Sequence, residues 1–233
     1  EIVVTYHDKF AHIGTILPIA EGPYVGYLKK EINDSGGDGV VNPGEDVDMT
    51  IWLKNYGSEP THGVYALLNT DDSYVSISVD SAYYGDMAPD DSSSGSNPYQ
   101  FSVDISAPDK HVVSFELPVI SAEGDTWVSH PSVMIKKPIL EYVDRFIDDP
   151  DSNHFPEPGE DFFLYVDVRN TGSATAYSAQ AVLTMDPDPY VEIADSTVEF
   201  GDILPDSTKR SLSGFSILID PLCPDPYQVY LYI

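Results

Sequence analysis

A long internal repeat constrains the fold of this chain more than any other feature of its sequence. The first loop, residues 34–45, has a second version at residues 149–160, and their first and last acids are equally far apart: 149 − 34 = 115 and 160 − 45 = 115. Each loop spaces oxygen-bearing residues along its length and ends in glutamate. A period of this size indicates tandem domains and not a solenoid of short repeats. The sequence therefore predicts two copies of one domain.

The segments that follow the two loops alternate between apolar and polar residues. Clusters of Gly, Pro, Asp and Asn interrupt this pattern at intervals of roughly ten residues, which is typical of an all-β sandwich. Successive side chains of a strand point to opposite faces, so one set in each segment should line the core. The predicted core residues are Val47, Met49, Ile51 and Leu53 after the first loop and Phe162, Leu164, Val166 and Val168 after the second.

The match between the copies extends on both sides of the loops. Residues 23–32 correspond to residues 138–147, again 115 positions later. Residues 85–89 correspond to residues 201–205, where the offset has become 201 − 85 = 116. One residue is therefore inserted in a loop between these points. The rest of the repeat keeps its register.

The repeat also sets the predicted domain boundaries. We predict two tandem immunoglobulin-like β-sandwich domains, at residues 22–136 and 137–233, and an N-terminal strand or hairpin segment at residues 1–21. Shifted by 115 positions, residues 1–19 fall on residues 116–134 of the first domain. The N-terminal segment is therefore predicted to be equivalent to the closing hairpin of a preceding repeat, and the second domain is expected to lack such a hairpin.

Three interpretations of the N-terminal segment follow. The chain is a segment of a longer array of domains, or it is a subunit whose hairpin completes the second domain of a neighbour by strand addition. In the third interpretation, the hairpin packs on the first domain of its own chain. An unpaired strand edge promotes aggregation, so some segment must cover the edge of the second domain.

The charge of the chain argues against several classes of partner. Its 39 acidic residues and 11 Lys and Arg residues give a formal net charge of −28. Nucleic acids and anionic membrane surfaces attract basic residues, so we expect neither as a partner. The sequence has no apolar run near the roughly 20 residues of a membrane-spanning helix, so we expect no membrane insertion. Few lysines and many Asp and Tyr residues fit an extracellular or cell-surface location.

Both loops have oxygen-bearing residues at the positions used by a twelve-residue calcium loop. These are positions 1, 3, 5, 7, 9 and 12, with a backbone carbonyl at position 7 and glutamate at position 12. Such hard ligands favour Ca²⁺ over zinc, which prefers His and Cys. The predicted calcium ligands are Asp34, Asp38, Val40, Asn42 and Glu45 in the first loop and Asp149, Asp151, Asn153, Phe155, Glu157 and Glu160 in the second.

The loops also admit a plainer interpretation. Gly36 at position 3 offers no side-chain ligand, and His154 stands where a sharp turn would favour glycine. A strand pattern follows each loop, so the geometry of a helix-flanked calcium site is not expected. Asp, Asn, Gly and Pro are also the residues of any tight surface turn.

Catalysis has little support in the sequence. The six histidines lie at scattered positions without the spacing of a metal site, and none is near the single cysteine, Cys223. We interpret Cys223 as a small apolar side chain in a turn, and a single cysteine excludes an internal disulfide. Acid pairs such as Asp71 and Asp72 lie in turn-rich segments typical of solvated loops. We predict that the chain is not an enzyme.

Several aromatic residues form a candidate contact surface. Stacked aromatic rings bind carbohydrate, but they also form contacts between domains and subunits, which is the interpretation that we favour. The aromatic residues considered are Trp52, Tyr56, Tyr65, Tyr83, Tyr84, Phe163 and Tyr165.

Two motifs carry a resemblance to a known family. Residues 37–45, Gly-Asp-Gly-Val-Val-Asn-Pro-Gly-Glu, precede an alternating strand and then the turn Asn-Tyr-Gly-Ser at residues 55–58. This arrangement resembles CARDB-like immunoglobulin-type modules, which recur in tandem in secreted bacterial and archaeal proteins and stand beside some gingipain-type peptidase domains. The resemblance covers most of residues 22–233 and implies a β-sandwich with adhesive, spacer or scaffolding duties. The second copy departs from it with Glu157 where the first has Asn42.

We therefore expect a non-catalytic extracellular structural or adhesion protein. Ca²⁺ would stabilise its tandem β-sandwiches, and strand addition would assemble copies into a filament or surface array. Its expected partners are other copies or neighbouring domains of the same array, and a cell-surface or glycan ligand. The alternative is an accessory module of a secreted hydrolase, serving as a spacer or binding substrate or glycan.

Overall fold

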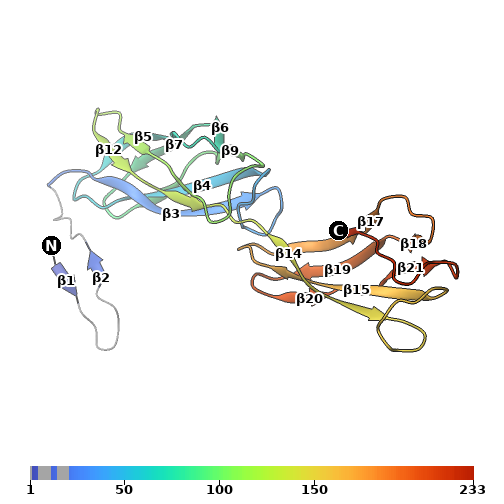
Figure 1. The fold of residues 1–233 in the computed structure, drawn as a ribbon. Coiled ribbons are helices and arrows are strands. Elements are labelled where there is room, and N and C mark those ends of the chain that lie inside the picture. Colours follow the sequence, from blue (N-terminus) through green and yellow to red (C-terminus); the bar gives the residue numbers. More distant parts are fainter. Residues whose placement is uncertain (1, 5–11, 15–20) are drawn as a thin grey trace. The chain divides into compact units, whose positions relative to one another are not determined.

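The computed structural model describes residues 2–4, 12–14 and 21–233, and over these ranges the chain is all-β, with antiparallel sheets and no helix (Figure 1). The expectation of an all-β fold is confirmed. The chain divides into two compact units: the first lies within Glu1–Ala107 and His111–Ile135, and the second comprises Pro108–Lys110 and Lys136–Ile233. None of the described residues belongs to a helix long and apolar enough to cross a membrane.

The described strands of the first unit form three sheets and the separate pair β1–β2. The larger two have the orders β3-β4-β9-β6, with β8 also paired to β4, and β12-β11-β5-β7, while β10 pairs with β13. The strands are β1 (Ile2–Val4), β2 (His12–Gly14), β3 (Val25–Asp34), β4 (Asp46–Asn55), β5 (Thr61–Leu67), β6 (Val75–Val79), β7 (Ser81–Met87), β8 (Ser92–Ser94), β9 (Tyr99–Val103), β10 (Val112–Ser114), β11 (Leu117–Ile120), β12 (Thr126–Ser129) and β13 (Ser132–Met134).

The core of the first unit contains side chains from both larger sheets and from β10 and β13, an arrangement consistent with a β-sandwich. The predicted alternation along β4 is confirmed, because Val47, Met49, Ile51 and Leu53 are all buried. Of the aromatic residues considered as a contact surface, Tyr84 lies in this core instead. It occupies an inward position of β7, and its hydroxyl donates to the Ile51 carbonyl at 3.2 Å.

The second unit repeats the sheet order of the first. Its larger sheet has the order β14-β15-β21-β18, with β20 also paired to β15, while β16 pairs with β19 and β17 with β22. The predicted core residues of β15 are buried, as they are in β4. The strands are β14 (Leu140–Asp148), β15 (Asp161–Asn170), β16 (Ala176–Val182), β17 (Thr184–Met185), β18 (Val191–Asp195), β19 (Thr197–Ile203), β20 (Thr208–Arg210), β21 (Phe215–Ile219) and β22 (Leu231–Tyr232).

A buried asparagine ends the strand after each loop. The Asn55 side-chain oxygen accepts from the Tyr24 and Gly57 amides, and its amide group donates to the Glu59 and Met87 carbonyls. Asn170, 115 residues later, makes the same set of four hydrogen bonds, and both side chains are fully buried. Each asparagine thereby ties the end of its strand to the preceding strand and to the turn that follows.

The pair β1–β2 has the register of the pair β11–β12. Subtracting 115 from each residue number of the second pair gives the first: 117 − 115 = 2 and 129 − 115 = 14. The paired residues are Ile2 with Gly14, Val3 with Ile13 and Val4 with His12 in β1–β2, and Leu117 with Ser129, Pro118 with Val128 and Val119 with Trp127 in β11–β12.

The two units differ at one edge of the smaller sheet. In the first unit β5 lies between β7 and β11, whereas the corresponding strand β16 pairs with β19 alone among the described strands. The second unit also contains a cavity of about 740 Å³, whose largely apolar lining includes Phe162, Leu164 and Leu231. The core of the second unit is therefore less completely covered than that of the first.

Candidate functional site

The two predicted calcium loops have the same backbone course. Positive φ angles occur at three corresponding positions: position 4 (Gly37, 77°; Ser152, 62°), position 6 (Gly39, 74°; His154, 64°) and position 11 (Gly44, 86°; Gly159, 88°). The second loop keeps this conformation although Ser and His tolerate positive φ less well than Gly. Differences between the loops therefore lie in their side chains.

The first loop satisfies its own first carboxylate. Asp34 is buried, with 6% of its surface exposed. Its two oxygens accept hydrogen bonds from the Gly37 amide at 2.6 Å and the Gly39 amide at 2.8 Å. The carboxylate thus exchanges its water for backbone donors, which is the usual way to accommodate a buried charge.

Glu45 closes the other end of the first loop. Its Oε2 accepts from the Asn42 amide at 2.8 Å. Burial raises the pKa of Glu45, as do the nearby carboxylates of Asp34 and Asp38, while backbone donors at Asn42 and Gly36 lower it. A Cβ atom on Gly36 would collide with Glu45 Oε1 and lie 3.1 Å from Asp34 Oδ1. Position 3 therefore lies between the carboxylates of positions 1 and 12.

The second loop leaves its first carboxylate without a partner. Asp149 is buried to the same extent as Asp34, with 6% of its surface exposed. Neither of its side-chain oxygens has a hydrogen-bond partner among the described residues. A buried carboxylate without donors is costly, and each such group in a native protein calls for an explanation.

Three other acids of the second loop gather in one place. One carboxylate oxygen each from Asp151, Glu157 and Glu160 lies within 4.8 Å of the others. The Glu157 amide donates to Glu160 Oε2 at 3.0 Å, which repeats the bond between positions 9 and 12 of the first loop. The described residues of the first loop form no comparable group.

The remaining predicted ligands have other contacts. The Asn153 side chain donates to Asp151 Oδ2 at 2.8 Å and accepts from the Phe155 amide at 2.6 Å, so it braces the loop. In the first loop, Asp38 Oδ1 accepts from the Val40 amide at 2.8 Å.

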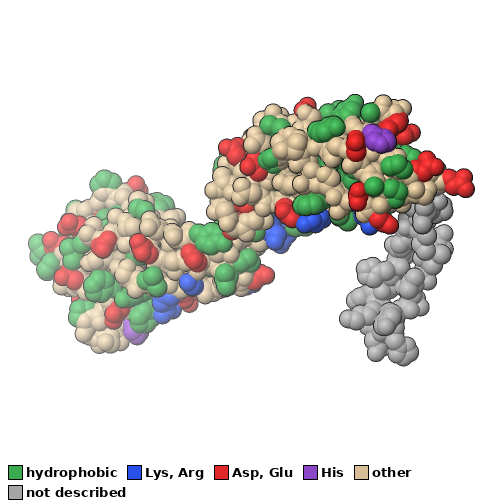
Figure 2. Space-filling model, turned by 180° about the vertical axis from the view of Figure 1, so that it is seen from behind, with side chains coloured by type: hydrophobic (Ala, Val, Ile, Leu, Met, Phe, Trp, Pro, Cys, Tyr) green, Lys and Arg blue, Asp and Glu red, His purple; other side chains and the backbone are tan. Residues whose placement is uncertain are grey.

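Acidic side chains by themselves do not mark a site on this molecule. They are scattered over the visible face of both units in Figure 2, among apolar and neutral residues. None of the ion pairs formed by the described residues involves Asp149, Asp151, Glu157 or Glu160. These four acids stand out because one is buried without donors and three converge.

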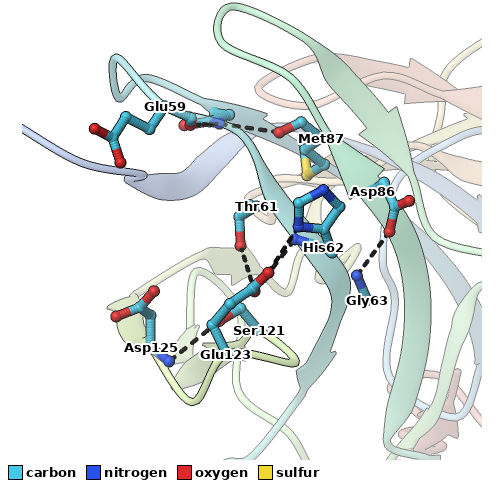
Figure 3. Close-up of polar contacts among 10 residues, drawn as sticks. Glu59, Thr61, His62, Gly63, Asp86, Met87, Ser121, Glu123 and Asp125 are labelled. Atoms are coloured by element: carbon cyan, nitrogen blue, oxygen red, sulfur yellow. Dashed lines mark hydrogen bonds and ion pairs between the residues drawn. The ribbon is translucent and has the colours of Figure 1, made fainter.

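A second polar cluster lies in the first unit and was not predicted from the sequence (Figure 3). His62 Nδ1 and Glu123 Oε1 are 2.7 Å apart, and Glu123 Oε2 accepts from the His62 amide at 3.3 Å and the Thr61 hydroxyl at 3.3 Å. Hydrogen bonding to His62 lowers the pKa of Glu123 to about 2, and the same contact raises the pKa of His62. The cluster joins the start of β5 to the turn between β11 and β12.

The sequence offered no signal for this cluster. His62 and Glu123 are 61 residues apart, and Tyr177 stands where the repeat would place a second histidine (62 + 115 = 177). Another described histidine, His111, pairs with Asp72 at 2.7 Å. Both histidines thus pair with acids that are distant in the sequence. The single cysteine, Cys223, has a pKa raised by burial and by nearby aspartates, which keeps its thiol protonated.

Comparisons with known proteins add little. No family model matches the sequence, and no curated protein matches it. Among solved structures, the secreted serine protease VesC from Vibrio cholerae aligns at a TM-score of 0.28 and 10% identity, covering 82% of this chain and 46% of that chain. The chain thus spans about half the length of that protein, and at this level of similarity the match says nothing about function.

Proposed function

We propose that this chain is a non-catalytic structural segment of an extracellular or cell-surface array, built from two immunoglobulin-like β-sandwiches. Copies join when the β1–β2 pair of one copy adds to the edge of β16 in the second unit of another. Strand addition of this kind uses backbone hydrogen bonds for affinity and side-chain pockets for register.

The observation that carries the proposal is the shared register of β1–β2 and β11–β12. In the first unit, β11 continues the smaller sheet beyond β5, with Val119 opposite Ala66. A pair of strands with the same register fits the same kind of edge. The corresponding positions are Val4, since 119 − 115 = 4, and Ala181, since 66 + 115 = 181.

Two features of the second unit support an acceptor role. The edge of β16 away from β19 is not paired with any described strand, and such edges promote association with other chains. The cavity of about 740 Å³ in the same unit is lined largely by apolar side chains, including Val166, Ile217 and Val229. Strands added to β16 would extend the smaller sheet of this unit and bury further apolar surface, as β11 does beside β5 in the first unit.

Disulfide cross-linking between two differently labelled chains tests the proposal. Both chains carry Cys223→Ser; one also carries Val4→Cys and the other Ala181→Cys. After mixing and mild oxidation, we expect a covalent dimer on a non-reducing gel, because strand addition in the β11–β5 register brings these positions together. A chain with Gln180→Cys in place of Ala181→Cys is the matched control, because the neighbouring side chain points to the opposite face.

Three outcomes would contradict the proposal. One is equal cross-linking at positions 180 and 181, which would indicate random collision. Another is a chain that sediments as a monomer at high concentration and gives no cross-link in any pairing. A cross-link within one chain carrying both Val4→Cys and Ala181→Cys, without one between chains, would also contradict assembly of copies.

A further inference from the structure

We propose that the second loop binds one Ca²⁺ ion through the carboxylates of Asp149, Asp151, Glu157 and Glu160, and that the first loop folds without an ion. This ion binding does not depend on the assembly of copies, and either proposal can fail while the other holds.

The buried carboxylate of Asp149 points to a cation. Its counterpart Asp34 is equally buried but accepts two backbone hydrogen bonds, whereas the oxygens of Asp149 have no donor among the described residues. Buried charges in proteins are paired with opposite charges or coordinate metals. No Lys, Arg or His of the described chain forms an ion pair with Asp149 either, so a cation bound beside it would supply the opposite charge that its carboxylate lacks.

Comparison of the loops relates Asp149 to the three converging acids, although the group within 4.8 Å does not include it. In the first loop, a side chain at position 3 would lie between the carboxylates of positions 1 and 12, as the crowding at Gly36 shows. Asp151 occupies position 3 of the second loop, which has the same pattern of positive φ angles. The Asp151 carboxylate lies within 4.8 Å of that of Glu160, and the place of Gly36 beside Asp34 implies that Asp151 also neighbours Asp149.

The spacing of the converging acids suits Ca²⁺. Calcium binds oxygen at 2.3–2.6 Å, so two ligands on opposite sides of one ion lie roughly 5 Å apart. The oxygens of Asp151, Glu157 and Glu160 lie within 4.8 Å of one another, which allows all three to contact one ion. Four carboxylates offer hard ligands of high charge, and the absence of Cys and of a converging His in the group disfavours zinc.

The first loop has replaced the ion with backbone donors. Two amides satisfy Asp34, and the Asn42 amide satisfies one oxygen of Glu45. Glycine at position 3 and asparagine at position 9 remove two of the carboxylates that the second loop has there. The same backbone is therefore closed by hydrogen bonds in one unit and by an ion in the other.

Calorimetric titration of the chelated full chain with CaCl₂, with MgCl₂ in parallel, tests the proposal. We expect one Ca²⁺ per chain with a dissociation constant on the order of 10⁻⁴–10⁻³ M, and weaker Mg²⁺ binding because Mg²⁺ demands near-octahedral geometry and dehydrates reluctantly. Glu160→Gln should weaken Ca²⁺ binding at least about tenfold, since it removes a charged ligand. Glu45→Gln, the same change at the same position of the first loop, should leave it unchanged.

Circular dichroism without calcium checks that both glutamine variants fold, because glutamine keeps an oxygen for the amide of position 9. Asp151→Asn, at an exposed position, is a second variant expected to weaken binding. The proposal is overturned if the wild-type chain shows no binding up to roughly 10 mM Ca²⁺, a range that covers the affinities of extracellular modules. It is also overturned if two ions bind per chain, or if Glu45→Gln weakens binding as much as Glu160→Gln.

Discussion

At the scale of single residues, the repeat preserves the hydrogen bonds of Asn55 and Asn170. The sequence predicts a turn at each asparagine, because Asn and Gly are common in turns. It does not reveal that each side chain reaches a preceding strand and the carbonyl of a residue more than 30 positions later. Those partners are set by the packing of the sheets and are distant in the chain.

We predict that Asn170→Ala destabilises the second unit by roughly 3–5 kcal/mol. The change leaves buried backbone amides and carbonyls without partners, at a cost of about 1–3 kcal/mol for each group that water cannot reach. Urea unfolding measures the change in the free energy of unfolding. Thr171→Ala is the control, because its exposed hydroxyl makes only a long bond, 3.4 Å, to the Ile139 carbonyl. A decrease of less than about 1 kcal/mol in the free energy of unfolding of Asn170→Ala would contradict this prediction and show that water replaces the lost hydrogen bonds.

At the scale of elements, the contact between His62 and Glu123 holds β5 to the β11–β12 turn (Figure 3). The pKa of Glu123 falls from its ordinary 4.5 to about 2, so its contribution to stability is present above pH 4.5 and is lost as the pH falls toward 2. The pKa of His62 is raised from 6.5, so its contribution is complete below pH 6.5 and is lost as the pH rises through the raised value. The ion pair is therefore strongest between about pH 4.5 and 6.5.

We predict that His62→Gln lowers the melting temperature of the first unit by about 1–3 °C near pH 5.5 and has a smaller effect at pH 8.5. The effect is small because both side chains are exposed to solvent. Thermal melts at the two pH values measure it. Lys29→Gln removes another exposed ion pair, with Glu31, and serves as the control because that pair contains no histidine. An equal loss at both pH values would contradict the role of the charged histidine.

The elements themselves could be predicted from the sequence where burial repeats every second residue. The alternation in β4 and β15 predicted their core faces correctly, because one face of each strand packs against the opposite sheet. The segment after residue 111 is less regular: it forms β10 and β11, which pair with different strands. Periodicity shows which face is buried, but it does not show which strand is the partner.

The candidate ion site could be predicted only in part. Loop spacing identified both sets of acids, because the repeat aligned them. It did not distinguish the loops, since Asp34 and Asp149 are identical in sequence and differ in whether backbone amides point at them. That difference lies in how each aspartate side chain meets the loop amides, which a residue pattern does not record.

At the scale of the whole molecule, the two units share an architecture and differ in how completely their cores are covered. The first unit buries side chains from β10, β11 and β13, and the second contains an apolar-lined cavity. Apolar surface left uncovered contributes less to stability. The two units should therefore unfold at different temperatures.

We predict two calorimetric transitions, with the second unit unfolding first. Addition of 10 mM CaCl₂, which is about 100 times a dissociation constant of roughly 10⁻⁴ M, should stabilise that unit by about 2.7 kcal/mol and leave the other transition in place. Glu160→Gln should abolish the shift. Differential scanning calorimetry with and without chelator measures both transitions. A shift of both transitions, or of the higher one alone, would contradict an ion held only in the second loop.

The shared register of β1–β2 and β11–β12 has a consequence for symmetry. A donor pair and an acceptor edge at different places on one chain make a head-to-tail contact, which is heterologous and does not close on itself as a twofold dimer does. Chains joined in this way would form a polar series, with a free donor at one terminus and a free acceptor at the other. A chain that retains only the donor pair or only the acceptor edge would stop growth at one terminus of the series. The proportion of such chains in a mixture would therefore set the mean length of the series.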